Sequence, residues 1–178
     1  MLDSDNAVLI VVDVQGKLAQ LMHEKDRLFD NLSRLIRGAG VLALPVICTE
    51  QNPKALGPTI PQLAPLVTTE PIPKLTFSCC QEARFMDELT KLGRRQVLLS
   101  GIEAHICIYQ TSVELVENDY DVHVIADAVS SRTAENRQIA LDQMRSVGAK
   151  ITSTEAALFE LLRTAEREEF RHILELVK

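Results

Sequence analysis

The chain has 178 residues, of which 46% are hydrophobic and 25% are charged, and this matches a single globular domain over residues 1–178. The composition excludes a disordered chain, a collagen and a coiled coil. The net charge of −6, from 19 basic and 25 acidic residues, argues against nucleic acid as the main partner, because phosphate backbones are bound by clustered Lys and Arg.

No segment has the character of a targeting or membrane sequence. Residues 1–6 carry two Asp and no basic residue, unlike a signal peptide. The longest uncharged stretch, 55–69, contains three Pro and is shorter than the ~20 residues that span a bilayer. Four Cys without a C-x-x-C pattern suggest reduced thiols. We therefore expect a cytoplasmic protein without a membrane partner.

The N-terminal half begins with an apolar, β-branched run over 7–14, which predicts a strand buried on both faces. Helical spacing of Leu and Ile predicts a helix over 26–39 that stops at Gly40. A second strand is expected over 44–48. Residues 51–73 are rich in Pro and Thr and predict a long irregular segment, of a kind that is often functional, with a helical turn near 61–64 and a strand near 70–73.

The C-terminal half continues the alternation of strands and helices. The patterns predict strands over 96–100, 122–126 and 149–152, and helices over 81–92, 106–118, 133–147, 154–162 and 166–176. Six strands alternating with helices predict an α/β fold, a doubly wound and mainly parallel six-stranded sheet with helices on both faces. Ligands of such folds bind beyond the carboxyl ends of the strands. No G-x-G-x-x-G follows a strand and no P-loop is present, so no nucleotide cofactor is expected.

Three residues stand where chemistry is expected. Asp13 lies near the end of the most apolar strand, where a carboxylate either pairs or has a raised pKa, in a functional or a capping role. Cys107 begins a predicted helix, and the free N–H groups there favour a thiolate, although most lone Cys are small buried apolar residues. Lys74 follows two Pro and can stabilise a neighbouring anion, although most Lys are simply solvated.

The remaining Cys and His give weaker signals. His105 and Cys107 form H-x-C without the further ligands that zinc needs, and His23, His123 and His172 complete no ligand set, so no metal is expected. Cys79 and Cys80 are adjacent and are interpreted as packed thiols rather than a redox switch.

Asp13, Lys74 and Cys107 occur in segments that resemble the isochorismatase-like cysteine hydrolases, in particular the isochorismatase domain-containing proteins. The segments are LIVVDVQGKL around Asp13, PKLTFSC around Lys74 and LLSGIEAHICIYQT around Cys107, supported by VHVIADAVSSRT from Val122. The resemblance runs over about residues 7–155. It implies the doubly wound fold and an Asp–Lys–Cys triad at the carboxyl ends of the strands.

The resemblance also implies a role for each residue. Cys107 matches the nucleophile, Asp13 the base, and Lys74 the residue that stabilises the thiolate. A non-proline cis peptide is expected between Ile102 and Glu103, turning backbone N–H groups, including that of Cys107, towards the substrate oxygen. Gln15 and Phe77 are candidates for the substrate pocket, with local packing as an equal alternative.

Two departures from the family narrow the expected chemistry. The metal ligands of the family's nicotinamidases are missing, because the matching stretch 49–52 reads TEQN without a His. Relatives that act on isochorismate without covalent catalysis tend to lack the Cys that this chain has. We therefore expect a hydrolase of a small amide-like or related carbonyl substrate, with a covalent intermediate on Cys107 and no cofactor.

Two other functions are compatible with the sequence. The chain can be a non-catalytic binding or scaffold protein on the same fold, or a thiol redox protein that uses Cys107 or Cys79. A homo-oligomer, a dimer or larger, is expected from the resemblance. Apolar residues of the terminal helices can serve such an interface or can pack on the chain's own sheet: Phe159, Leu161, Leu162, Phe170, Ile173, Leu174 and Leu176.

Overall fold

The computed structural model describes residues 1–178 and contains one sheet of six parallel strands. The strand order is β3-β2-β1-β4-β5-β6, which confirms the expected doubly wound α/β fold. The bounds are β1 Ala7–Val12, β2 Val46–Gln51, β3 Ile72–Lys74, β4 Gln96–Ile102, β5 Asp121–Ser130 and β6 Lys150–Thr152.

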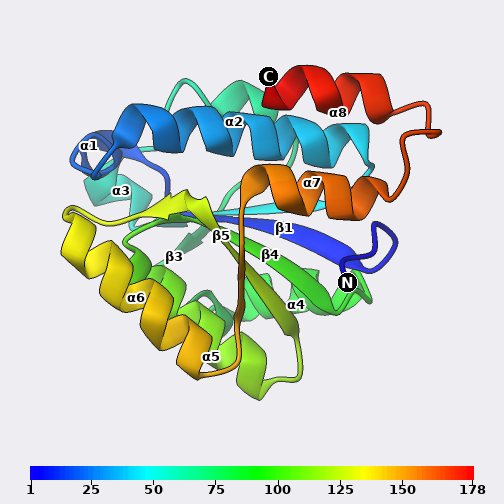
Figure 1. The fold of residues 1–178 in the computed structure, drawn as a ribbon. Helices are drawn as coiled ribbons and strands as arrows, with labels where there is room; N and C mark the ends of the chain where they lie inside the picture. The colour runs from blue at the N-terminus through cyan, green and yellow to red at the C-terminus, as the bar shows by residue number, and fades with distance from the viewer.

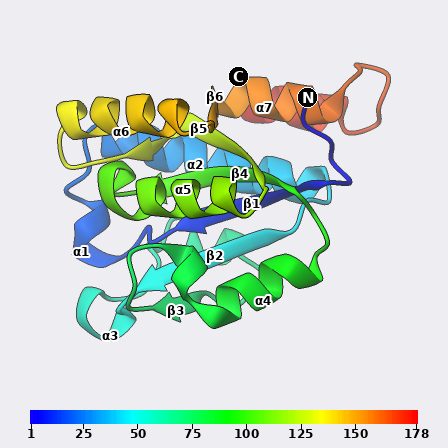
Figure 2. The ribbon, with the colours of Figure 1, turned by 90° about the horizontal axis from the view of Figure 1, so that it is seen from below.

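Helices cover both faces of this sheet (Figure 1). One face carries α2 (Lys25–Val41), α7 (Thr154–Leu162) and α8 (Phe170–Val177). The other carries α4 (Ala83–Lys91), α5 (Tyr109–Glu117) and α6 (Ala134–Ser146), which lie in front of the sheet in Figure 2. The short helices α1 (Gly16–Ala19) and α3 (Pro53–Leu56) lie at the end of the sheet where β1 and β2 finish.

Strand β1 explains why both faces must be covered. Its side chains alternate, so Leu9 and Val11 enter the core under α2 while Ile10 and Val12 enter the core under α4 to α6. All six residues of β1 are fully buried. Burial of apolar surface stabilises the fold by about 25 cal/mol per Å², so this central strand contributes to both cores.

Several element boundaries differ from the sequence-based expectation. Helix α2 passes through Gly40, and the left-handed residue that ends it is Ala43 (φ 55°). The irregular segment contains α3, which was not expected, and its 3-10 turn η1 lies at Ala64–Leu66. A second 3-10 turn, η2, spans Cys79–Gln81 ahead of α4. These differences arise because tertiary packing, rather than local propensity, sets where short elements begin and end.

The terminal helices pack on the chain's own core. Leu161, Leu162 and Ile173 are buried there, and Phe159, Phe170 and Leu176 pack against the same cluster. Their apolar character is therefore explained without a partner subunit. None of the helices combines the length and the apolar character needed to cross a bilayer.

Candidate active site

The topology places the candidate residues at one end of the sheet. From β1 the chain moves to β2 and β3 on one side, and β4, β5 and β6 lie on the other. The crevice of a doubly wound sheet lies where this order reverses, beyond the carboxyl ends of β1 and β4. Asp13 directly follows β1, Lys74 is the last residue of β3, and the turn that carries Cys107 follows β4.

Asp13 is buried and has a donor on each carboxylate oxygen. Its Oδ2 lies 2.7 Å from Lys74 Nζ, and its Oδ1 accepts a 2.7 Å hydrogen bond from Thr49 Oγ1. Its backbone N–H donates to the carbonyl of Thr49 at 3.1 Å, and its φ of 57° is left-handed. The β1–β2 pair therefore fixes both the backbone and the side chain of Asp13.

Lys74 is buried and makes four polar contacts through Nζ. Besides Asp13, Nζ donates to Gln51 Oε1 at 2.7 Å and to the carbonyls of Thr76 and Phe77 at 3.1 Å each. Burial, the largest single influence, lowers the pKa of Lys74, but the neighbouring acidic groups, Asp13 first among them, together outweigh it and hold the pKa of Lys74 above its ordinary value. Lys74 is therefore a fixed positive charge.

The turn after β4 presents Cys107. Glu103 takes a left-handed conformation (φ 53°), and a π-helical turn, η3 (Ala104–Ile108), leads into α5. The expected cis peptide between Ile102 and Glu103 is wrong, because the chain contains no cis peptide bond. The chain reverses instead through the positive φ values of Gly101 (129°) and Glu103, which turn the backbone while its peptide bonds stay trans.

Cys107 is buried among groups that hold it in the thiol form. Burial and then the charge of Asp13 raise the pKa of Cys107 well above its ordinary range, and the charge of Lys74 opposes them only in part. The resting residue is therefore a neutral thiol at neutral pH. A nucleophilic Cys107 needs a base to remove its proton, and the carboxylate that influences its pKa is Asp13.

A cavity of about 200 Å³ lies beside Asp13 and Cys107. Asp13 and Cys107 line it together with apolar side chains, among them Leu18, Leu56, Phe77 and Ile106. Phe77 therefore lies at the pocket as expected, with 55% of its surface exposed. Gln15 does not line this cavity. Its amide bonds the backbone of Gln51 and Gly57 instead, which is a packing role.

Sequence reasoning missed three residues of this site, Thr49, Gln51 and Arg132. Thr49 and Gln51 hold Asp13 and Lys74, and Glu103 and Arg132 form an ion pair in the cavity wall. The alternation of side chains along a strand puts Thr49 and Gln51 on one face of β2, and this was the available signal. Nothing local in the sequence pairs Glu103 with Arg132, which lie 29 positions apart.

The other cysteines are free and have weakly acidic thiols. Burial raises the pKa of Cys79 to about 11, and those of Cys48 and Cys80 to about 12. Cys79 Sγ lies 3.8 Å from Thr49 Oγ1, which in turn bonds Asp13. None of these thiols ionises appreciably at neutral pH, so none has the reactivity of an exposed redox cysteine.

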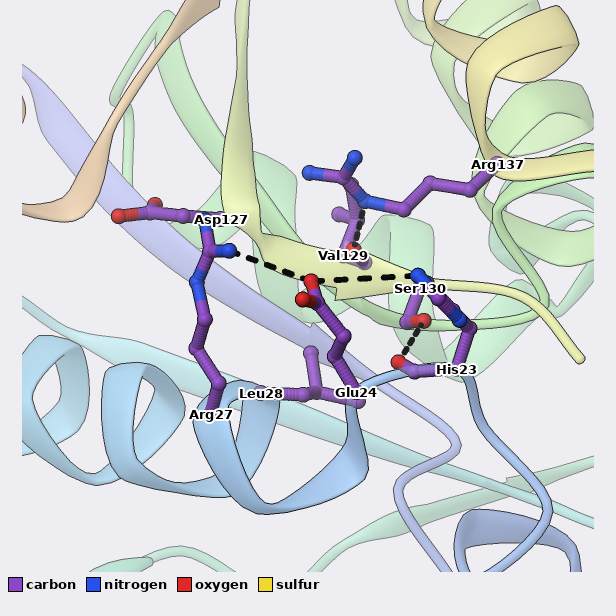
Figure 3. A pocket seen from close by; sticks show the side chains of 8 residues that line it. All are labelled: His23, Glu24, Arg27, Leu28, Asp127, Val129, Ser130 and Arg137. Carbon is purple, nitrogen blue, oxygen red and sulfur yellow. Dashed lines mark hydrogen bonds and ion pairs between the residues drawn. The ribbon is translucent and has the colours of Figure 1, made fainter. Parts of the chain in front are cut away.

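A second depression lies away from Cys107, between α2, β5 and α6 (Figure 3). Its charged side chains are already engaged: Arg27 pairs with Glu24, and Arg137 donates to the carbonyls of Val129 and Ala126. Its volume of about 10 Å³ has room for no more than about one water molecule. This depression is a packed polar contact rather than a ligand site.

Comparison with known proteins gives the family of this chain. Residues 7–156 match the isochorismatase domain. The chain belongs to the isochorismatase family. This isochorismatase-family protein is 36% identical to isochorismatase domain-containing protein 2 of Danio rerio, over 99% of this chain and 89% of the relative.

Two further relatives carry different functional descriptions. The protein is 36% identical to a protein of Phytophthora sojae described as the secreted isochorismatase effector Isc1, over 97% of this chain and 85% of the relative. It also superposes on the structure of a MAR1 ribonuclease from Caenorhabditis elegans with a TM-score of 0.93 and 37% identity, covering 99% of this chain and 91% of that one. Membership of the family therefore fixes the fold and supports a hydrolase activity without naming its substrate.

Proposed function

We propose that the protein is a cysteine-dependent hydrolase of small amide-like or related carbonyl substrates. The observation that carries this proposal is that Asp13, fixed by Lys74 and Thr49, lines the same cavity as Cys107. A base-activated thiol with a fixed cation beside the base is the arrangement that nucleophilic acyl transfer requires.

The proposed reaction has two halves. Asp13 takes the Cys107 proton as sulfur attacks the carbonyl carbon, and Lys74 stabilises the negative charge. The C–N bond then breaks, and the leaving amine or ammonia takes the proton from Asp13. In the second half, Asp13 removes a proton from water, which attacks the thioester carbonyl. The S–C bond breaks, Cys107 regains its proton, and the carboxylic acid leaves.

The turn after β4 supplies the proposed oxyanion donors. The backbone N–H groups of Glu103 and Cys107 lie in this turn, which begins directly after Ile102, the last residue of β4. Donors fixed by the fold before reaction stabilise a developing oxyanion without having to reorganise. The left-handed conformation of Glu103 supports this role, because strained backbone persists where the surroundings enforce it.

Two alternatives are weaker on physical grounds. A thiol redox protein needs an acidic, accessible thiol, whereas burial raises the pKa of every cysteine here. A non-catalytic binding protein has no need for a buried Asp–Lys pair, and such a pair costs several kcal/mol in desolvation before its attraction offsets it.

Ribonuclease activity is a second candidate because of the C. elegans relative. Two observations weigh against it: the net charge of −6, and the pairing of the cavity's one lining cation, Arg132, with Glu103, while Lys74 behind the cavity is paired with Asp13. Phosphodiester binding relies on uncommitted basic groups. A single-stranded RNA substrate therefore belongs in the first assay, and RNA cleavage abolished by Cys107→Ser would replace the amide proposal.

The deciding experiment is acylation of Cys107 by 4-nitrophenyl acetate, followed by a panel of small primary amides assayed for ammonia release. We expect a burst of nitrophenolate, an acetyl group on Cys107 found by peptide mass spectrometry, and ammonia release from an amide. Cys107→Ser should show none of these, whereas Asp13→Asn, which keeps the thiol but lacks the base, should release no ammonia. If the wild-type protein forms no acyl adduct on Cys107 and releases no ammonia, the protein is a binding protein on this fold.

Assembly and location complete the proposal. We expect a homo-oligomer, tested by light scattering. Leu75 and Phe77, which are exposed large apolar side chains, favour it. We also expect a cytoplasmic protein acting on a small molecule. Because the P. sojae relative is described as secreted, cell fractionation is the test of location.

A further inference from the structure

The cavity wall contains a second ion pair, between Glu103 and Arg132. Arg132 Nε donates to Glu103 Oε1 at 3.0 Å. Only 8% of the Glu103 side chain is exposed, against 52% for Arg132. Both residues line the cavity that holds Cys107. The buried partner is therefore the anion, and the cation lies above it towards solvent.

Glu103 is an unusual residue for its position. Its φ of 53° is a conformation that costs an ordinary residue about 1 kcal/mol or more. Its Oε2 is buried and has no hydrogen-bond partner, and His105 Nε2 lies 3.7 Å from it. Burying a carboxylate oxygen without a hydrogen-bond partner costs free energy of folding. In this cavity the negative charge of Glu103 is balanced mainly by the positive charge of Arg132.

The charges around the cavity cancel in pairs. Asp13 is matched by Lys74, whose Nζ is fully engaged, and Glu103 is matched by Arg132. The remaining wall is largely apolar, and the volume of about 200 Å³ corresponds to about seven water molecules. An anionic ligand would lose its hydration here without meeting an uncommitted cation.

We propose that Glu103 sets the charge selectivity of this cavity: its carboxylate neutralises Arg132, so that the site takes small uncharged acyl compounds and rejects anionic ones of the same size. This inference rests on the proposed acyl chemistry of Cys107 and names its substrate class. Glu103 is then a specificity-determining residue rather than a structural ion-pair partner.

The test compares two alkylating probes of nearly equal size, neutral iodoacetamide and anionic iodoacetate. In both reactions the Cys107 thiolate displaces iodide, forming an S–C bond as the C–I bond breaks. The readout is the ratio of the two alkylation rates at Cys107, measured by peptide mass spectrometry and divided by the same ratio for glutathione. Because both probes consume the same thiolate, this ratio does not depend on the thiol pKa of each variant.

We expect the wild-type ratio to exceed that of glutathione. Glu103→Gln leaves Arg132 without its anion, so the ratio falls by about tenfold, the size of one partly screened charge interaction. Arg132→Gln leaves Glu103 uncompensated, so the ratio rises. In the double variant the ratio returns towards the wild-type value. Glu155→Gln, at an exposed position of α7, changes the net charge by the same amount as Glu103→Gln and leaves the ratio unchanged.

An unchanged ratio in both single variants overturns the proposal, as does a wild-type preference for iodoacetate over the glutathione reference. Arg132→Gln keeps the test valid if Glu103→Gln fails to fold, because Arg132 is half exposed. The outcome is separable from the hydrolase proposal. An acyl adduct on Cys107 with unchanged ratios defeats the charge selectivity alone, whereas shifted ratios without any acyl adduct defeat the hydrolase alone.

Discussion

Lys74 Nζ lies 2.7 Å from Asp13 Oδ2, with both side chains buried, although the two residues are 61 positions apart in the sequence. The contact exists because β1 and β3 end at the same edge of a parallel sheet, with β2 between them. It makes Asp13 a carboxylate whose charge and orientation are fixed before any substrate arrives.

Replacing Asp13 by Asn should have opposite effects on the alkylation rate of Cys107 and on the turnover of an acyl substrate. The charge of Asp13 raises the pKa of Cys107 and that of Lys74 lowers it, so Asp13→Asn lowers the pKa of the thiol. Alkylation of Cys107 by iodoacetamide at pH 8 should therefore become faster than in wild type, while acyl turnover is lost because the base is gone.

The pH dependence of alkylation, measured by mass spectrometry, checks this reversal. Lys74→Met is the matched opposite, because it removes the charge that favours the thiolate and should slow alkylation at the same pH. A slower Cys107 reaction in Asp13→Asn would contradict the assignment of Asp13 as the neighbouring charge.

Removing Lys74 should also destabilise the fold. Lys74→Met leaves Asp13 buried with Thr49 as its remaining side-chain donor, and breaking a buried pair from one side costs about 3–5 kcal/mol. Urea unfolding at pH 7 measures the change. Lys54→Met, at an exposed position on α3, is the control and should leave the free energy of unfolding unchanged. If Lys74→Met lowers the free energy of unfolding no more than Lys54→Met does, the Asp13–Lys74 pair is solvated rather than buried.

Stability should decline at alkaline pH because of the buried thiols. In the unfolded chain a thiol ionises near 9.0, whereas folding raises the pKa of Cys48 to about 12, so above pH 9 the folded state binds more protons. The free energy of unfolding therefore falls with rising pH, by about 1.4 kcal/mol per pH unit for each such thiol.

Urea unfolding between pH 9 and 10.5 measures this slope in wild type and in Cys48→Ala. Lysine side chains begin to lose protons in the unfolded chain over this range, because their ordinary pKa is 10.5, but this contribution is common to both proteins and cancels in the comparison. Cys48→Ala removes one thiol and should make the slope shallower by about 1.4 kcal/mol per pH unit, whatever it does to stability at pH 7. An identical slope in the two proteins would show that Cys48 ionises freely in the folded state.

Gly101 is required where β4 passes β1 before the turn that carries Cys107. A Cβ at this position would lie 2.2 Å from the carbonyl oxygen of Val12, and the φ of 129° is one that side chains rarely adopt. Gly101→Ala should cost about 3 kcal/mol or more and disturb Cys107. Thermal unfolding checks this, with Gly40→Ala in α2 as the control.

Gly40 has open space around it, and Ala favours a helix by up to about 1 kcal/mol over Gly. Gly40→Ala should therefore be neutral or slightly stabilising. If Gly101→Ala unfolds at the same temperature as Gly40→Ala, the β1–β4 approach is looser than the structure indicates.

Apolar periodicity in the sequence is enough to predict the strand–helix alternation and the doubly wound sheet, and the resemblance of short segments points to Asp13, Lys74 and Cys107. Both signals are local, so a single chain reveals them. The contacts between distant residues became visible only in the folded chain: Thr49 with Asp13, Gln51 with Lys74, and Arg132 with Glu103.

Tertiary packing also replaced the expected cis peptide with a left-handed turn at Glu103, and assigned Gln15 to the packing of a loop. The physical reason is common to these cases. A side chain's partners and a turn's dihedral angles depend on which strands become neighbours, and that order is a property of the folded sheet rather than of any short stretch of sequence.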